Sequence, residues 1–133
     1  MYSRFIIGSI VNDKEWYRNG KKHRIRFLPA VIYGDGEVEY WVNGFNYILE
    51  DGVLFLNSEC VGIVPKVIYK DGTRSWGRRR MKGILHLHRK SGPAVIYGNG
   101  DYEYWVYGKR HGITSYCGKQ YLFKDGEFVK CIV

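Results

Sequence analysis

Cysteine is scarce in this chain, and its arrangement is unsuited to cross-linking. The three cysteines, Cys60, Cys117 and Cys131, are odd in number, and no two are spaced Cys-x-x-Cys. Small secreted domains commonly replace a large core with several disulfides, and this pattern does not support such a framework. We therefore expect a protein of a reducing, intracellular compartment that is not secreted.

Long hydrophobic runs and helical patterns are also missing. The apolar residues 5–11 are too few to cross a membrane as a helix, and no small-residue cleavage site follows them, so an opening strand is the better prediction. No stretch has a clean 3.6-residue period, and long helices are not expected. The sequence thus predicts neither a transmembrane segment nor a helical domain.

Motifs for catalysis are not found. The chain has no Gly-x-Ser-x-Gly segment and no Walker-type loop, and no cysteine has a plausible histidine partner. Two pairs of acidic residues, Glu37 with Glu39 and Asp101 with Glu103, resemble the carboxylates of a hydrolase. Because they recur with the repeat described below, we assign them to its architecture, where they could pair with Lys or Arg across strands. We predict a non-enzymatic protein without a cofactor or small-molecule substrate.

A metal site is not expected either. His86 and His88 would share one face of a strand, a spacing that could begin a zinc site. No third or fourth ligand is evident in the sequence. Since His23 and His111 fall at equivalent places of the repeat, structural histidines near hairpin ends are the better interpretation.

The dominant feature is a segment, Pro-Ala-Val-Ile-Tyr, that occurs at 29–33 and again at 93–97, with a variant at 65–69. Turn glycines recur at spacings of 8 residues, 44 − 36 = 8 and 108 − 100 = 8, and most of them stand in Asn-Gly or Asp-Gly pairs, which favour type I′ hairpin turns. The predicted turn glycines are Gly20, Gly36, Gly44, Gly52, Gly72, Gly100, Gly108 and Gly126.

This spacing predicts an all-β fold, a meandering antiparallel sheet of about 10–12 short strands. We expect one domain over residues 1–133, with repeat units of about 14–44, 45–76, 77–108 and 109–133. Residues 38–42 alternate between an apolar face and a mixed face that carries Glu39 and Trp41. Aromatic residues recur with the repeat and are expected to pack along it: Trp16, Tyr33, Tyr40, Trp41, Tyr69, Trp76, Tyr97, Tyr104 and Trp105.

Basic residues outnumber acidic ones, 21 to 13, which gives a net charge of +8. The candidate interaction residues are Lys21, Lys22, Arg24, Arg26, Arg78, Arg79, Arg80, Lys82, Arg89 and Lys90. Three interpretations remain open: solvated charges that discourage edge-to-edge pairing, a surface for an acidic protein partner, or a surface for nucleic acid or anionic lipid.

The segment Trp-Tyr-Arg-Asn-Gly-Lys-Lys-His-Arg at 16–24, followed by Pro-Ala-Val-Ile-Tyr-Gly-Asp-Gly at 29–36, resembles a MORN-type repeat (membrane occupation and recognition nexus). It is most similar to the Trp-Tyr-x-Asn-Gly-Lys-x-His-Arg form of large DNA viruses and phages. The resemblance covers residues 14–44 and 86–126, and 65–76 in part; the arginine run at 78–80 departs from it.

This resemblance implies a twisted, elongated sheet of successive hairpins that serves as a scaffold or interaction module; some members are linked to phospholipid binding. The expected function is a structural or protein-interaction module, in its most concrete form a virus-encoded assembly or virion (minor capsid-type) component that binds capsid or assembly subunits. The alternative is a basic module that binds nucleic acid or anionic lipid through Arg78–Arg80 and their neighbours. Salt dependence separates the two, because phosphate binding weakens steeply as salt rises.

Overall fold

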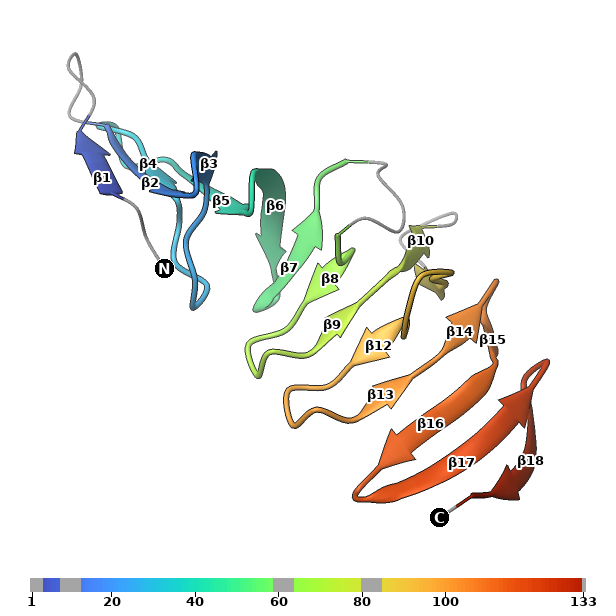
Figure 1. Ribbon diagram of the computed structural model, residues 1–133. Helices are drawn as coiled ribbons and strands as arrows, with labels where there is room; N and C mark the ends of the chain where they lie inside the picture. The colour runs from blue at the N-terminus through green and yellow to red at the C-terminus, as the bar shows by residue number, and fades with distance from the viewer. Residues whose placement is uncertain (1–3, 8–12, 59–63, 80–84, 133) are drawn as a thin grey trace. The chain divides into compact units, whose positions relative to one another are not determined.

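The computed structural model describes residues 4–7, 13–58, 64–79 and 85–132; at 4–7, 78–79 and 85 only the backbone is described. The chain divides into two compact units, Met1–Ser58 and Glu59–Val133, which we call the amino-terminal and carboxy-terminal units. The predicted all-β fold of successive antiparallel hairpins is confirmed, and the described residues contain no helix (Figure 1).

The amino-terminal unit is built from seven strands, which pair in the order β1-β2-β4-β5-β6-β7, with β3 pairing to β2. Their bounds are β1 (Arg4–Ile7), β2 (Lys14–Arg18), β3 (Lys21–Lys22), β4 (Val31–Ile32), β5 (Val38–Val42), β6 (Phe45–Glu50) and β7 (Val53–Leu56). The predicted opening strand corresponds to β1, and the other residues of 1–11 lie outside the described part.

The carboxy-terminal unit repeats this pattern with shorter strands, in the order β8-β9-β12-β13-β16-β17-β18. Two further hairpins, β10-β11 and β14-β15, pair separately. The bounds are β8 (Val67–Ile68), β9 (Arg74–Ser75), β10 (Gly77–Arg79), β11 (Leu85–Leu87), β12 (Val95–Ile96), β13 (Tyr102–Glu103), β14 (Trp105–Val106), β15 (Lys109–Arg110), β16 (Gly112–Tyr116), β17 (Lys119–Lys124) and β18 (Glu127–Cys131).

The described strands number 18, more than the 10–12 expected from turn spacing. The difference arises because single predicted strands are interrupted. In the amino-terminal unit β6 is continuous, whereas its counterpart is divided into β15 and β16 at His111, next to Gly112 with φ +79°. A left-handed backbone at this point breaks the ladder and re-aims the strand that follows.

The eight predicted turn glycines all have positive φ, but the turns are of two kinds. At Asn19-Gly20 both residues are left-handed, as a type I′ turn requires. In the turns at Gly36, Gly72 and Gly100, the glycine has positive φ but the residue before it does not. The predicted type I′ turn is therefore wrong at these three places. In those three turns the preceding Asp or Asn side chain accepts the N–H two residues on, at 2.8–2.9 Å, which stabilises a different local turn.

The core of each unit begins with its Pro-Ala-Val segment. Ala30 and Ala94 are completely buried, and each donates its N–H to the carbonyl of the glutamate on the next strand of the meander. At these strands the mixed face is the better covered one, since Glu103 is 8% exposed and Val38 is 44% exposed. The aromatic and acidic residues of that face are therefore part of the packed structure.

Candidate functional site

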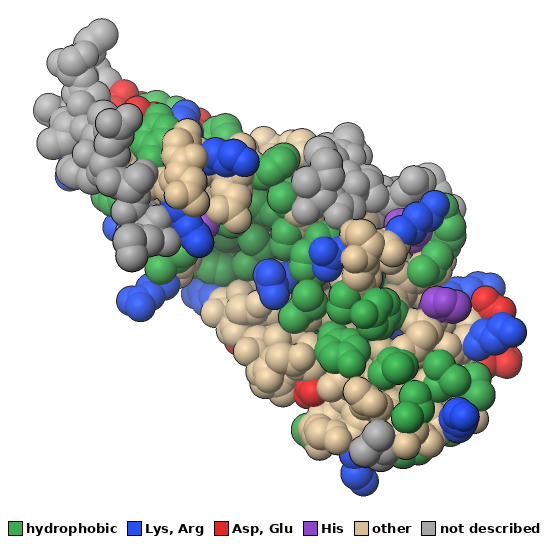
Figure 2. All heavy atoms as spheres, viewed as in Figure 1, with side chains coloured by type: hydrophobic (Ala, Val, Ile, Leu, Met, Phe, Trp, Pro, Cys, Tyr) green, Lys and Arg blue, Asp and Glu red, His purple; other side chains and the backbone are tan. Residues whose placement is uncertain are grey.

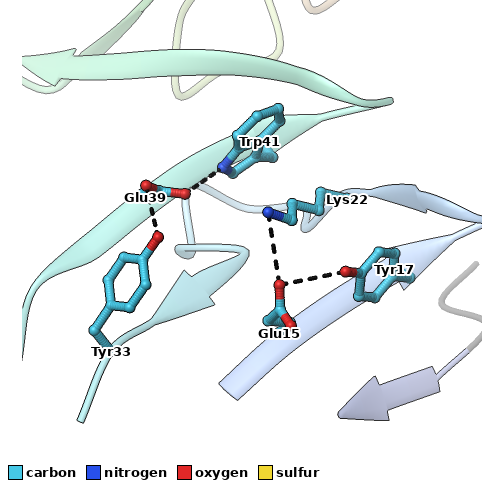
Figure 3. Close-up of polar contacts among 6 residues, drawn as sticks. All are labelled: Glu15, Tyr17, Lys22, Tyr33, Glu39 and Trp41. Carbon is cyan, nitrogen blue, oxygen red and sulfur yellow. Dashed lines mark hydrogen bonds and ion pairs between the residues drawn. The ribbon is translucent and has the colours of Figure 1, made fainter. Parts of the chain in front are cut away.

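A half-buried carboxylate accepts two hydrogen bonds in the amino-terminal unit. Glu39 on β5 accepts a hydrogen bond from the Tyr33 hydroxyl at 2.8 Å and another from the Trp41 indole N–H at 2.9 Å (Figure 3). Trp41 lies two residues from Glu39 on one strand, so both side chains leave the same face. The hydrogen bond to Glu39 raises the pKa of Tyr33, which stays a donor at neutral pH.

The carboxy-terminal unit contains the same arrangement 64 residues later, 93 − 29 = 64. Glu103 accepts hydrogen bonds from the Tyr97 hydroxyl and the Trp105 indole, both at 2.8 Å. Burial, followed by the bond to Glu103, raises the pKa of Tyr97 to about 12. These glutamates therefore hold an aromatic pair in place, and among the described side chains the expected pairing of these repeated carboxylates with Lys or Arg is found at Glu103.

That extra partner of Glu103 is Arg110 on β15, whose Nη2 lies 3.2 Å from the carboxylate. Its guanidinium carbon also lies 5.3 Å from the Trp105 ring centroid and 4.9 Å from that of Phe123. The equivalent residue of the other unit, 64 positions earlier, is Asn46, which donates to the Tyr40 carbonyl. The two units thus share the Tyr–Glu–Trp group and differ in what stands beside it.

Beside Arg110 the carboxy-terminal unit is hollowed into a cleft of about 590 Å³, which we call the aromatic–acidic cleft. Its residues come from the turns after β8 and β12 and from strands β13, β15, β16 and β17. They are Asp71, Tyr97, Gly98, Asn99, Asp101, Glu103, Arg110, Thr114, Ser115, Tyr116, Tyr121 and Phe123. Tyr116 at one end is 63% exposed. Figure 2 shows hydrophobic side chains gathered over the carboxy-terminal strands on the face that it draws.

The acidic end of the cleft is formed by close contact between two turns. Gly98 leaves no room for a side chain, because a Cβ there would collide with the Asp71 carbonyl oxygen. The Gly98 N–H also donates to the Thr73 hydroxyl at 3.2 Å. This contact sets the Asp71 turn against the turn after β12, and the backbone N–H of Thr73 holds the pKa of Asp71 below its usual value.

Asp101 is held firmly in its position. Its carboxylate accepts from the Ser115 hydroxyl at 3.0 Å, from the Cys117 N–H at 3.2 Å and from the Asn99 side chain at 3.1 Å. These bonds, the Cys117 N–H first, lower the pKa of Asp101. The cleft therefore keeps this carboxylate ionised and oriented at neutral pH.

Two of the basic candidates are used within the fold. Arg24 lies with its guanidinium carbon 3.8 Å from the Trp16 ring centroid, and Arg89 lies 3.9 Å from that of Trp76. Each guanidinium also donates to the carbonyl of the proline that begins the repeated segment, at 3.1 Å. Such stacked, hydrogen-bonded arginines stabilise the repeat and present little charge for a partner.

The other basic candidates are less engaged. Lys22 lies 3.6 Å from Glu15 and 4.9 Å from the Trp41 ring centroid (Figure 3). Three are exposed at separate turns: Lys21, Arg26 and Lys90. Arg78 and Arg79 lie in β10 with only their backbone described, and Arg80 and Lys82 lie outside the described residues.

The histidines are structural where their partners are known. Nδ1 of His23 accepts the Asn43 N–H at 2.8 Å, and Nδ1 of His88 accepts the Tyr107 N–H at 2.9 Å. Burial, and then nearby Arg18, lowers the pKa of His23. In the described part of the chain, no three His, Cys, Asp or Glu side chains are grouped as metal ligands. The match of His88 to His23 is hidden in the sequence because 11 residues separate Trp76 from His88, 88 − 76 − 1 = 11, whereas 6 separate Trp16 from His23, 23 − 16 − 1 = 6.

Sequence reasoning did not single out most of the cleft. Tyr116, Tyr121, Phe123 and Arg110 lie within the span of the repeat resemblance but were not named as site residues, and they line one cleft because β15, β16 and β17 follow one another beside β13. Cys117-Gly118 was also missed as a turn, although both residues have positive φ, 49° and 82°. The one available signal was that Arg110 stands where the other copy has asparagine.

Comparison of this chain with protein-family models, curated proteins and solved structures finds no match. Within the described residues, no helix has the length and hydrophobicity needed to cross a membrane.

Proposed function

We propose that this protein is a non-enzymatic structural or protein-interaction module that docks a partner protein at the aromatic–acidic cleft. The observation that carries this proposal is the cleft itself, about 590 Å³ in volume, which is lined by Tyr97, Tyr121, Phe123 and the exposed ring of Tyr116. Aromatic side chains that combine an apolar body with a polar tip are enriched in protein interfaces. Exposed apolar surface on a monomer commonly marks such an interface.

The repeated carboxylates support a role without catalysis. Glu39 and Glu103 hold equivalent tyrosine and tryptophan donors in both units, at nearly identical distances. A group that appears in each copy with its hydrogen-bonding capacity used by the fold is better suited to architecture than to proton transfer.

The partner is proposed to be a subunit of a larger assembly. The support is the resemblance of residues 16–24 and 29–36 to MORN-type repeats of large DNA viruses and phages. In this proposal the protein is a virus-encoded assembly or virion component of a reducing compartment, and its neighbour is a capsid or assembly protein.

Site-specific cross-linking would test the docking proposal. A photoreactive phenylalanine analogue would replace Tyr116 in the cleft or Tyr69, an exposed tyrosine of the same unit outside it. In cells that naturally make the protein, we expect one defined protein conjugate from position 116 and little from position 69. Equal, diffuse labelling from both positions would contradict a docking site at the cleft.

A second measurement addresses the basic alternative. The mass of the purified chain would be recorded at moderate and high salt, with and without nucleic acid. Because phosphate contacts release counterions, a complex made by the basic residues should dissociate as salt rises. A nucleic-acid complex of that kind, together with no protein conjugate at position 116, would replace the docking proposal with the alternative.

A further inference from the structure

The cleft already contains one cation that belongs to the chain. Arg110 lies against the rings of Trp105 and Phe123 and forms an ion pair with Glu103 at 3.2 Å. A guanidinium held by aromatic faces and a carboxylate is the arrangement by which proteins bind cationic groups from other molecules. This internal contact shows which chemistry the cleft accepts.

The cleft also has carboxylates and aromatic rings that Arg110 does not use. Asp71 and Asp101 line the same cleft, together with the rings of Tyr97 and Tyr121. Arg110 is the partner of Glu103, whereas Asp71 and Asp101 have no cationic partner among the described residues. With three carboxylates and one guanidinium, the lining carries a charge of 1 − 3 = −2, although the chain carries +8.

The negative charge of the cleft, in a chain of positive net charge, favours a cationic ligand. A negative, aromatic-lined cleft in a basic protein concentrates positive groups locally and repels negative ones. Both aspartates are fixed by backbone N–H groups, so no rearrangement is needed to receive a cation. Planar stacking and two-point hydrogen bonding favour a guanidinium over an ammonium group.

We propose that the aromatic–acidic cleft binds a cationic side chain, arginine in preference to lysine, that a partner protein presents. The side chain lies against Tyr97 and Tyr121 and pairs with Asp71 and Asp101. This inference rests on the proposed docking function and specifies the chemistry of the partner.

The test is an NMR titration of the full chain with four capped tripeptides that differ only in the central residue: arginine, lysine, citrulline or glutamate. Citrulline has nearly the shape of arginine without its charge. The Trp105 indole N–H reports on the cleft, and the Trp41 indole N–H, bonded to Glu39 in the same way, is an internal control in the other unit. We expect the arginine peptide to shift Trp105 and not Trp41, and citrulline to bind about fivefold more weakly or worse.

Three variants locate the cation. Asp71→Asn and Asp101→Asn should each weaken arginine binding about threefold or more, since each removes one paired charge. Asp101 also holds the turn at Cys117, whereas the Asp71 side chain bonds to Thr73 within its own turn, so Asp71→Asn is the safer variant for the fold. Glu37→Gln is the matched control: Glu37 stands 64 residues before Asp101, is exposed, and lies in the other unit.

Binding of citrulline as tight as that of arginine would overturn the proposal. So would equal shifts at Trp41 and Trp105, unchanged binding in Asp71→Asn and Asp101→Asn, or no shift with either cationic peptide up to about 10 mM. Failure here with a protein conjugate at position 116 would leave the docking function standing and remove its cationic partner. Binding of the arginine peptide without any conjugate at position 116 would leave the cation site standing and contradict the docking function.

Discussion

Each unit has an equivalent glutamate, Glu39 or Glu103, and comparing the two measures how much Arg110 contributes to stability. Replacing Glu39 or Glu103 with glutamine keeps the shape of the side chain and turns one acceptor oxygen into a donor. In the amino-terminal unit the amide can still satisfy both neighbours, because its oxygen accepts from the Trp41 indole and its nitrogen donates to the Tyr33 hydroxyl oxygen. Only the charge of the acceptor is lost, and we expect Glu39→Gln to cost about 1 kcal/mol.

In the carboxy-terminal unit the same change leaves Arg110 without its carboxylate. A hydrogen bond to a charged group contributes about 1.5–3 kcal/mol, but the side chain of Arg110 is 33% exposed and its share is screened by solvent. We therefore assign about 1 kcal/mol to the Arg110 pair and expect Glu103→Gln to cost about 2 kcal/mol in all.

The free energy of unfolding would be measured by urea titration for both variants, for Arg110→Met, and for Glu103→Gln combined with Arg110→Met. The double-mutant cycle isolates the coupling between positions 103 and 110, expected at about 1 kcal/mol. Equal costs for Glu39→Gln and Glu103→Gln, with a coupling below about 0.3 kcal/mol, would refute the idea that Arg110 is held by Glu103.

Three further predictions concern pH and sterics. The pKa of His23 is lowered from 6.5, so the neutral imidazole stabilises the fold and the free energy of unfolding should fall as pH drops below about 6.5. Urea titrations at several pH values should show this dependence, and His23→Gln should weaken it. The pKa of Tyr97 is raised to about 12, so the stability that Tyr97 contributes is fully present below pH 10 and is lost as pH rises toward 12. Absorbance at 295 nm should show late tyrosinate formation, to which Tyr33 and Tyr47 also contribute, and Tyr97→Phe should reduce its amplitude by one tyrosine. Gly98→Ala should lower stability by about 2 kcal/mol or more, because its Cβ meets the Asp71 backbone, whereas Ala at Gly118, which has open space, should cost only about 1 kcal/mol for its positive φ.

The fold class could be predicted because local signals and the repeat agree. Each glycine at a predicted turn lies at positive φ, and a residue without a Cβ is the natural choice for that backbone. The number of strands could not be predicted in the same way. The break beside Gly112 depends on how β16 meets β13, a contact between segments whose registers differ from those in the other unit.

The candidate site was much less visible in the sequence. The basic residues attracted attention by their number, yet Arg24 and Arg89 are stacked on tryptophans inside the repeat. The cleft is formed by residues from 71 to 123, and no local pattern links Asp71 with Phe123. Long-range contacts of this kind follow from strand order, which spacing alone does not give.

The difference between the two copies is the more useful guide to function. Residues that are identical in both, such as the tyrosine, glutamate and tryptophan around Glu39 and Glu103, perform the same structural task twice. The cleft instead uses positions where the copies differ: Asn46 corresponds to Arg110, and Glu37 corresponds to Asp101. Since both units fold with the shared residues, the substitutions at 101 and 110 are not required by the repeat itself. The proposed role in binding a partner would account for the paired arginine, the oriented aspartate and the cleft that they line in the carboxy-terminal unit.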